Sequence, residues 1–433
     1  MTGAVLFCVI LAQAPSPESL PSPPESPPSS PESPPSPESV PSLPSSRAVG
    51  PAEPAKLDGS APLAVAPPGA TSGGRAAPMR ALTMEQVSEG TTEEMTIRNV
   101  RWRYSLNFFG DVSLGIASSG APHPELGFAI GAQDFLLKGE LGSHFVALTE
   151  FDLEPGDAGI DVDIERYHVR WQSEHVFVQM GRSHTAFGYW NNAYHHGRWL
   201  QPTIERPRWV AFEDDGGLLP VHWVGLNLGA KLELGSARLD AVVSVGNGRG
   251  KVVDDVRNTR DYQSLKAFHA SVELVGIYWS ELRAGVAAVV DRIVGQPDRV
   301  ALPGQAIDEL IGGVHVAYAG LPLLVIAEGY SVIHQAGSQR WSTAGGFGLI
   351  AYAFGRFSPY VEVESFVPRG GPDPFFLPNP AEESPSFDTL EGIAGLRIDL
   401  SDWTALKAEL RETRLLDRSV SIREGLVNWS WGF

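Results

Sequence analysis

The chain has 433 residues, of which 43% are hydrophobic and 19% are charged, and its formal net charge is −18. This acidity argues against nucleic acid as a partner, because binding a phosphate backbone needs a basic surface that the sequence lacks. No apolar run approaches the roughly 20 residues of a membrane-spanning helix. Any passage through a bilayer must therefore use a closed β-barrel, the other structure that satisfies every backbone polar group in lipid.

The first 14 residues resemble an export signal. An apolar run covers residues 4–12, and Ala12-Gln13-Ala14 at its end has the small residues of a signal cleavage site. No Lys or Arg precedes this run, so we expect residues 1–14 to be a signal peptide, either complete or truncated at its start. The single cysteine, Cys8, lies in the run, and the bulky Phe7 before it disfavours a lipoprotein anchor.

Residues 15–96 are expected to form a disordered linker rich in Pro, Ser and Ala. Residues 15–46 repeat Pro, Ser and Glu, a composition that cannot bury a core and favours polyproline II. At about 3.1 Å per residue, such a tract acts as a stiff spacer. Residues 47–82 continue as an Ala/Pro/Gly-rich linker, and residues 83–95 are either a short helix or further solvated linker.

Residues 97–433 have a period of two. From Val224 to Leu234, apolar side chains occupy every second position, and the positions between them are Gly225, Asn227, Gly229, Lys231 and Glu233. This alternation gives a strand one apolar and one polar face. We therefore expect an all-β fold, a membrane-spanning antiparallel up-and-down β-barrel of about 16 strands. The strands are expected to start near Tyr104, Leu126, Ser143, Asp161, His175, Val221, Ala237, Ser264, Glu281, Asp308, Leu323, Arg340, Phe357, Phe387, Thr404 and Ser419.

The predicted connections alternate between tight and long. The tight ones are at 137–143, 172–174, 234–237, 319–322, 354–357 and 400–403, and the longer ones at 186–219, 247–263, 293–307 and 368–386. Outer-membrane barrels show this asymmetry, with short periplasmic turns and long outer loops. An even number of strands also places both termini, and with them the N-terminal arm, in the periplasm.

The last strand ends in alternating large residues. Val427, Trp429, Trp431 and Phe433 share one face, which resembles the signature that the barrel-insertion machinery of the bacterial outer membrane recognises through a C-terminal aromatic residue. We therefore expect that machinery to bind the chain at Phe433.

One segment resembles a known family. Between Gly181 and Ala230 lie Gly181-Arg182, an FGYWN run at 187–191, an HHG run at 195–197, Arg206-Pro207, and Gly216 to Pro220. This order is similar to that of bacterial outer-membrane porins of the phosphate-selective group. The resemblance implies a sixteen-stranded channel that can assemble as a homotrimer, and whose third outer loop folds inward to narrow the pore.

We expect the connection at 186–219 to be that loop, since long loops in compact domains are usually functional. The alternative is an outward loop that covers the barrel rim. Aromatic residues would anchor the loop to the wall, and charged residues would face each other across the constriction. The predicted constriction residues are Tyr189, Trp190, His195, His196, Arg198, Arg206, Arg208, Glu213, Asp214 and Asp215.

The side chains expected to line the lumen carry both signs of charge. They are Arg170, Lys231, Glu233, Arg283, Asp291, Glu362, Glu364 and Arg397. Phosphate capture needs a dense ladder of Lys and Arg, because a desolvated oxyanion requires charged donors. The mixture departs from the phosphate-selective members and favours a weak or cation-leaning preference.

The sequence therefore predicts a porin for small hydrophilic solutes or ions, set in the lipid of the bacterial outer membrane. The alternative is a structural, envelope-anchoring barrel with a plugged lumen. No catalytic motif such as GxSxG or HExxH is present, so we expect no enzyme activity and no cofactor. His184, His195, His196 and His222 lack the convergent spacing of a zinc site, and we expect no metal.

Overall fold

The computed structural model describes residues 93–97, 100–118, 126–156, 159–194, 197–213, 216–253, 260–262, 265–297, 302–371, 373–376, 388–417 and 419–433. The predicted signal peptide and all of the predicted linker up to residue 92 lie outside these residues. Among the residues described, no helix is both long and apolar enough to cross a membrane.

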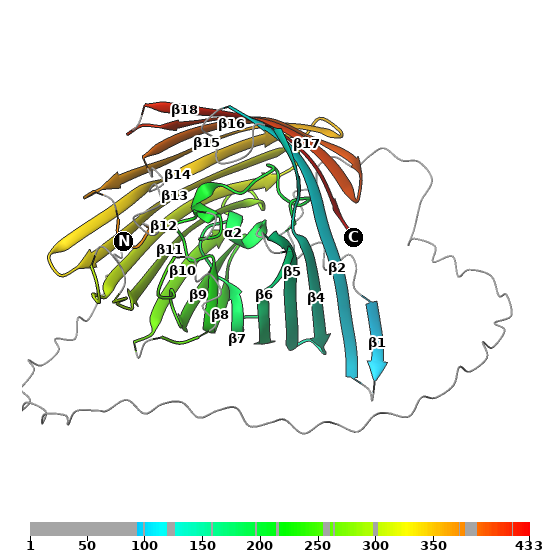
Figure 1. The fold of residues 1–433 in the computed structure, drawn as a ribbon. Coiled ribbons are helices and arrows are strands. Elements are labelled where there is room, and N and C mark those ends of the chain that lie inside the picture. The colour runs from blue at the N-terminus through cyan, green and yellow to red at the C-terminus, as the bar shows by residue number, and fades with distance from the viewer. Residues whose placement is uncertain are drawn as a thin grey trace, which may run out of the picture. The chain divides into compact units, whose positions relative to one another are not determined.

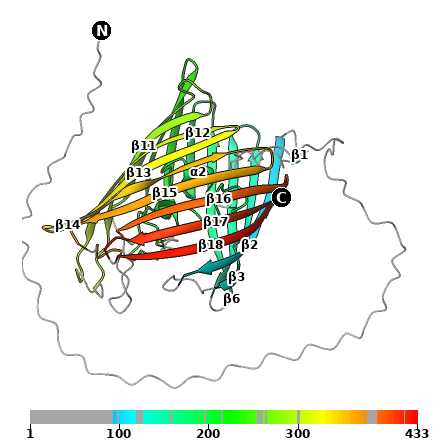
Figure 2. The same cartoon turned by 90° about the horizontal axis from the view of Figure 1, so that it is seen from above.

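Antiparallel strands close into a barrel (Figures 1 and 2). β2 (Val100–Ala117) pairs with β4 (Gln133–Leu141) on one side and with the last strand on the other, and the remaining strands pair in chain order. They are β5 (Phe145–Gly156), β6 (Gly159–Gln172), β7 (Val176–His184), β8 (His222–Leu234), β9 (Ala237–Gly246), β10 (Ala267–Val275), β11 (Leu282–Ile293), β12 (Ile307–Gly320), β13 (Leu323–Ala336), β14 (Gln339–Tyr352), β15 (Phe357–Arg369), β16 (Thr389–Ser401), β17 (Thr404–Leu415) and β18 (Val420–Gly432).

Two short strands complete the set. β3 (Leu126–Ile130) pairs with β2 in line with β4, so β3 and β4 form one strand interrupted at residues 131–132. β1 (Glu93–Ile97) forms a hairpin with the start of β2. Of the eighteen strands in the described part of the chain, β1 lies outside the ring, and β3 and β4 count as one, which leaves the sixteen that were predicted.

The two faces of the wall differ as the period of two requires. On β15, Val361 and Val363 point outward and are exposed, whereas Glu362 and Glu364 point inward and are buried. The same alternation recurs on β17, where Leu410 points outward and Lys407 inward. The outer face is therefore apolar and suited to lipid, and the inner face carries the polar groups.

The predicted strand starts differ from the observed ones by at most four residues, the largest difference being Tyr104 against Val100. Connections at one end of the barrel are short, as at 235–236 and 321–322, and the longest connection, at 185–221, lies at the other end. Three connections at that second end are also tight, at 157–158, 337–338 and 416–419. The optional helix over 83–95 is wrong where it can be examined, because residues 93–95 belong to β1.

Candidate functional site

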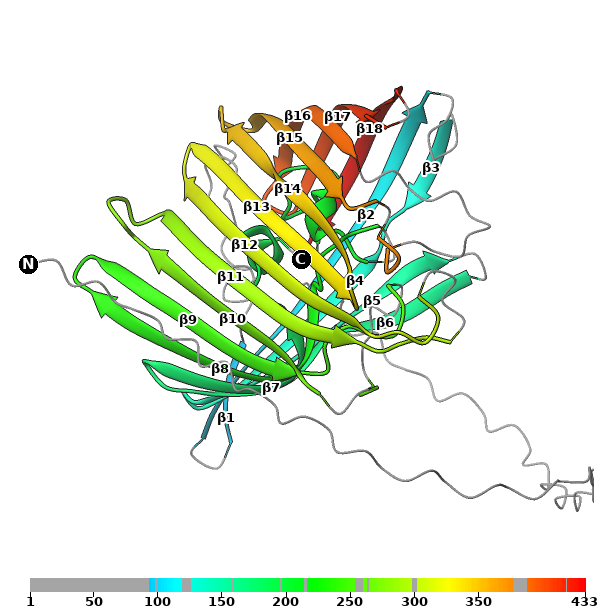
Figure 3. The ribbon, with the colours of Figure 1, turned by 90° about the vertical axis from the view of Figure 1, so that its left-hand side faces the viewer.

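The connection between β7 and β8, residues 185–221, lies within the ring of strands (Figures 1 and 3), and we name it the inner segment. It contains α2 (Trp190–Ala193) and a single 3₁₀ turn at Arg208–Val210. Its two ends are fastened together, because the Thr185 N–H donates to the Val221 carbonyl at 3.0 Å. The Asn191 side-chain amide donates to both of those residues' carbonyls, at 2.9 and 3.3 Å.

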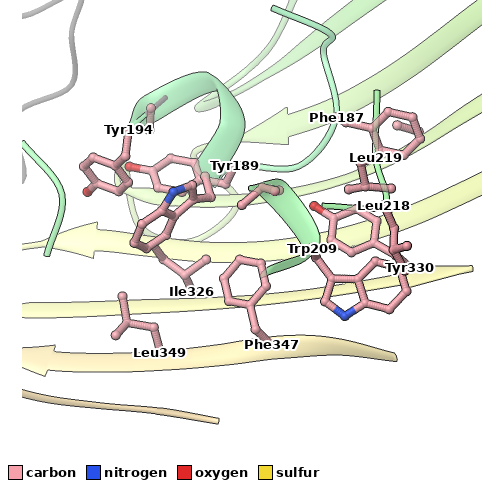
Figure 4. Packing of buried hydrophobic residues seen from close by; sticks show 14 of the residues in the cluster. Phe187, Tyr189, Tyr194, Trp209, Leu218, Leu219, Ile326, Tyr330, Phe347 and Leu349 are labelled. Atoms are coloured by element: carbon pink, nitrogen blue, oxygen red, sulfur yellow. The ribbon is translucent and has the colours of Figure 1, made fainter. Parts of the chain in front are cut away.

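Aromatic side chains of the inner segment pack against the inward face of β13, β14 and β15 (Figure 4). Trp209 stacks on Phe366 with ring centroids 4.6 Å apart, and its indole N–H donates to the Ser365 carbonyl at 2.9 Å. Trp190 meets the ring of Phe347 edge-on at 6.0 Å. Both indoles are fully buried. Large aromatic rings bury more apolar area than other side chains, so these contacts hold the segment to the wall.

Charged groups of the wall bind the backbone of the inner segment. The Glu328 carboxylate on β13 accepts the N–H groups of Tyr189 and Trp190 at 2.8 and 2.7 Å, which are orphan donors at the start of α2. Four strands further around the ring, Glu409 on β17 accepts the Ile204 N–H at 2.6 Å. A carboxylate that accepts backbone N–H bonds makes stronger hydrogen bonds than a neutral acceptor would.

Two wall cations complement these carboxylates. The Arg397 guanidinium on β16 donates to the carbonyls of Trp199 and Gln201 at 2.5 and 3.0 Å. The Lys407 ammonium on β17 donates to the carbonyls of Arg198 and Thr203, the latter at 2.7 Å. Both cations are buried. Their charges therefore hold the segment in place instead of facing open water.

Of the described charged side chains of the inner segment, the three most exposed form ion pairs with the wall. Arg198, Glu205 and Arg208 are 36%, 39% and 44% exposed. Each faces a buried wall partner of opposite charge: Arg198 lies 3.1 Å from Asp111, Glu205 2.6 Å from Arg411, and Arg208 3.3 Å from Glu391. The inner segment therefore leaves a zone uncovered inside the barrel where both signs of charge meet.

The other predicted constriction residues that the structure describes have contacts different from those of Arg198 and Arg208. Tyr189 and Trp190 are buried against the wall, and Arg206 lies over the Phe212 ring at 3.9 Å. Glu213 lies 3.6 Å from Arg249. Outside the described residues are His195, His196, Asp214 and Asp215.

The phenol of Tyr194 is also enclosed within the inner segment. Burial raises the pKa of Tyr194 well above its usual value, and the adjoining Tyr189 phenol raises it further. The Tyr194 phenol therefore stays protonated, and the ring remains part of the apolar packing around α2.

The predicted lumen residues divide into two groups. Beneath the inner segment and the neighbouring loops, four are buried: Asp291, Glu362, Glu364 and Arg397. Toward the end with the short turns, Arg170 donates to Gln179 at 2.8 Å, Arg283 lies 3.1 Å from Glu273, and Lys231 and Glu233 are exposed.

Glu328, Glu409 and Arg411 were not among the predicted site residues. Their inward position on β13 and β17 follows the period of two, and that pattern could have identified them. Among the described residues, no three potential metal ligands form a group that could hold an ion.

No protein-family model matches the sequence, and a search of curated proteins also finds no match. Among solved structures, the anion-selective porin from Comamonas acidovorans aligns with a TM-score of 0.54 and 13% identity, over 77% of this chain and all of the porin. The barrel has the porin fold. OmpF of Salmonella typhi, in complex with daunomycin, has a TM-score of 0.53 at 9% identity, over 76% of this chain and 98% of OmpF.

The outer-membrane channel DcaP of Acinetobacter baumannii also aligns, with a TM-score of 0.51 and 10% identity over 78% of this chain and 99% of DcaP. The alignments extend over almost the whole of these three porin barrels. Because the sequence identities are low, the likeness concerns the fold alone. A specific relation to the phosphate-selective group is not among these findings.

Proposed function

We propose that this protein is a porin of the bacterial outer membrane, through which small hydrophilic solutes or ions diffuse passively. The observation that carries the proposal is the exposure of Arg198, Glu205 and Arg208 inside a closed barrel, because side chains there contact water only if a wet path reaches them. The inner segment narrows that path, and solutes are filtered by size and by charge. No chemical step is part of this function.

The inner segment sets a weak, cation-leaning preference in this proposal. On β16 and β17, the carboxylates of Glu391 and Glu409 lie 3.6 and 2.7 Å from the Arg411 guanidinium. The chain as a whole has a net charge of −18, and a narrow channel with low-dielectric walls focuses the potential of such an excess of negative charge. Phosphate selectivity is not proposed, because wall cations such as Arg397 and Lys407 donate to carbonyls of the inner segment.

The further parts of the proposal concern assembly and orientation. The N-terminal arm would lie in the periplasm, since β2 begins and β18 ends at the end with the short turns. Phe433 is exposed and stacks against Phe108 and Trp403, at 6.4 Å in each case, so its ring is available to the insertion machinery. A homotrimer remains the proposed assembly, and one of the structural relatives, OmpT of Vibrio cholerae, is described as a trimer.

Conductance in planar lipid bilayers tests the proposal. We expect the folded protein to give discrete current steps, and deletion of residues 195–215 to enlarge them because the narrowest part is removed. An unchanged step size after the deletion would contradict the proposal that the inner segment narrows the pore, but it would not contradict the proposal that the protein is a porin. Folded, inserted protein without current would contradict the porin.

That last outcome would favour the alternative, an anchoring barrel with a plugged lumen. One observation supports this alternative. Ile326 and Leu349 point inward at mid-barrel and are almost completely buried by the inner segment. The same bilayer measurement therefore separates the two functions.

A further inference from the structure

The lipid-facing side of β17 and β18 carries a group of charged residues. Glu412, Arg414 and Arg423 share the outward face with Leu410 and Val427, and Glu412 and Arg423 are direct cross-strand partners. The Glu412 carboxylate lies 3.0 Å from Arg414 and 3.7 Å from Arg423. Two guanidiniums therefore share one carboxylate, which leaves an excess of one positive charge.

The arginines are far more exposed than the acid between them. Arg423 is 75% exposed, Arg414 58% and Glu412 35%. Elsewhere on the outward face, Arg292 and Asp308 form a pair with one charge of each sign, at 3.1 Å. On the outward face of β17 and β18, the two exposed arginines therefore outnumber the one carboxylate with which they pair.

These residues lie near one end of the lipid-facing wall, where a lipid headgroup is expected. Arg414 is next to the last residue of β17, and Arg423 is the fourth residue of β18, so both are close to the hairpin that joins the two strands. That hairpin lies at the end of the barrel opposite the start of β2 and the end of β18. Below the arginines the outward face becomes apolar, with Ile116 and Leu410 exposed.

A groove of about 480 Å³ extends from Arg423 and Glu412 into this apolar zone. Outward side chains of Val361, Val363, Ala394 and Leu410 form its sides. Gly392 forms part of the floor, and a Cβ atom added there would meet nothing within 4 Å. The groove is therefore open where a side chain would otherwise fill it.

From this geometry we propose that the groove binds one lipid whose headgroup carries an anionic phosphate. The phosphate lies between Arg414 and Arg423, and an acyl chain occupies the groove over Gly392. A guanidinium is planar, and two of its N–H groups can donate side by side to two oxygens of one phosphate. A lipid phosphate would therefore supply acceptors to the exposed N–H groups of both arginines. The proposal rests on the insertion of the barrel into a bilayer, which belongs to the proposed function.

Native mass spectrometry of the folded barrel in detergent tests the site, with phosphatidylglycerol and phosphatidylcholine as the two probes. We expect the unaltered protein to retain phosphatidylglycerol in preference to phosphatidylcholine. The double variant R414Q/R423Q should weaken phosphatidylglycerol binding by about thirtyfold, since each arginine near a lipid headgroup contributes about one kilocalorie per mole. Arg292→Gln, on the same outward face, is the matched control and should bind both lipids unchanged.

A second variant examines the groove without altering charge. Gly392→Leu fills the floor while both arginines remain, and we expect it to weaken phosphatidylglycerol binding as well. Circular dichroism verifies that each variant is folded. Equal binding of the two lipids by the unaltered protein, or unchanged binding by R414Q/R423Q, would overturn the proposal.

If R414Q/R423Q instead lowers the oligomeric state without changing lipid binding, a second copy covers this face and the lipid site is wrong. The measurement is made in detergent and needs no current. If the protein gives no current, the lipid-binding measurement can still be interpreted. If the protein shows no lipid preference, the proposed channel function is not contradicted.

Discussion

The carboxylate of Glu328 lies across the first turn of α2, where it accepts the backbone N–H of Trp190 at 2.7 Å. The contact joins β13 to a residue 138 positions earlier in the chain. Four strands further around the ring, Glu409 on β17 makes the equivalent bond to the Ile204 N–H. The two carboxylates bind the backbone of the inner segment from different strands of the wall. Together they hold the segment at two separate points.

Replacing Glu328 tests the first of these contacts. Glu328→Ala leaves the N–H groups of Tyr189 and Trp190 buried without an acceptor, so we expect the free energy of unfolding to fall by ~2–3 kcal/mol. Glu328→Gln keeps an amide oxygen as acceptor and should lose less. Urea unfolding of the folded barrel, followed by tryptophan fluorescence, measures both. Equal stabilities for the unaltered protein and Glu328→Ala would contradict this account.

Lys407 tests the other side of the inner segment. Its ammonium donates to the carbonyls of Arg198 and Thr203, and Lys407→Met keeps the length of the side chain without its donors. We expect the backbone at 198–205 to loosen, which should widen the distribution of single-channel currents and raise their mean. Lys231→Met changes an exposed lysine of β8 and is the control. A current distribution that is the same in both variants would argue against Lys407 as an anchor.

Most of the fold could be predicted because it depends on local pattern. The period of two from Val224 to Leu234 fixes which side chains share a face, and turn residues fix where strands begin, so sixteen strands were identified correctly. The same pattern says which face is buried but not what covers it. Arg397 was therefore expected to face the lumen, whereas its guanidinium binds the carbonyls of Trp199 and Gln201.

The contacts of the anchors could not be predicted for a related reason. The inward position of Glu328 follows from the period of two, but its contact with Trp190 depends on the path that the inner segment takes inside the barrel, and that path has no local signal. The strand at 93–97 was missed similarly, because its pairing with β2 outweighs the weak local preferences of its five residues.

Alkaline pH tests the enclosure of Tyr194. Its pKa is raised in the folded protein, so folding holds the phenolic proton, while the unfolded chain releases it near the ordinary value of 10.0. The free energy of unfolding should therefore decrease as pH rises above about 10. Tyr194→Phe removes this contribution, so between about pH 9 and about pH 11 the variant should lose less stability than the unaltered protein. Urea unfolding at the two pH values measures this, and equal losses would mean that water reaches the phenol.

The partly exposed charges of the inner segment should control ion preference. Arg208→Gln removes a positive charge opposite Glu391 and leaves that carboxylate paired with Arg411 alone, so the reversal potential under a KCl gradient should shift toward cation selectivity. Glu205→Gln removes a negative charge beside Arg411 and should shift it the opposite way. The control is Arg292→Gln, whose side chain faces outward and pairs with Asp308. Shifts of the same sign in the two inner variants, or a shift in the control as large as theirs, would place the ion-selecting charges elsewhere in the barrel.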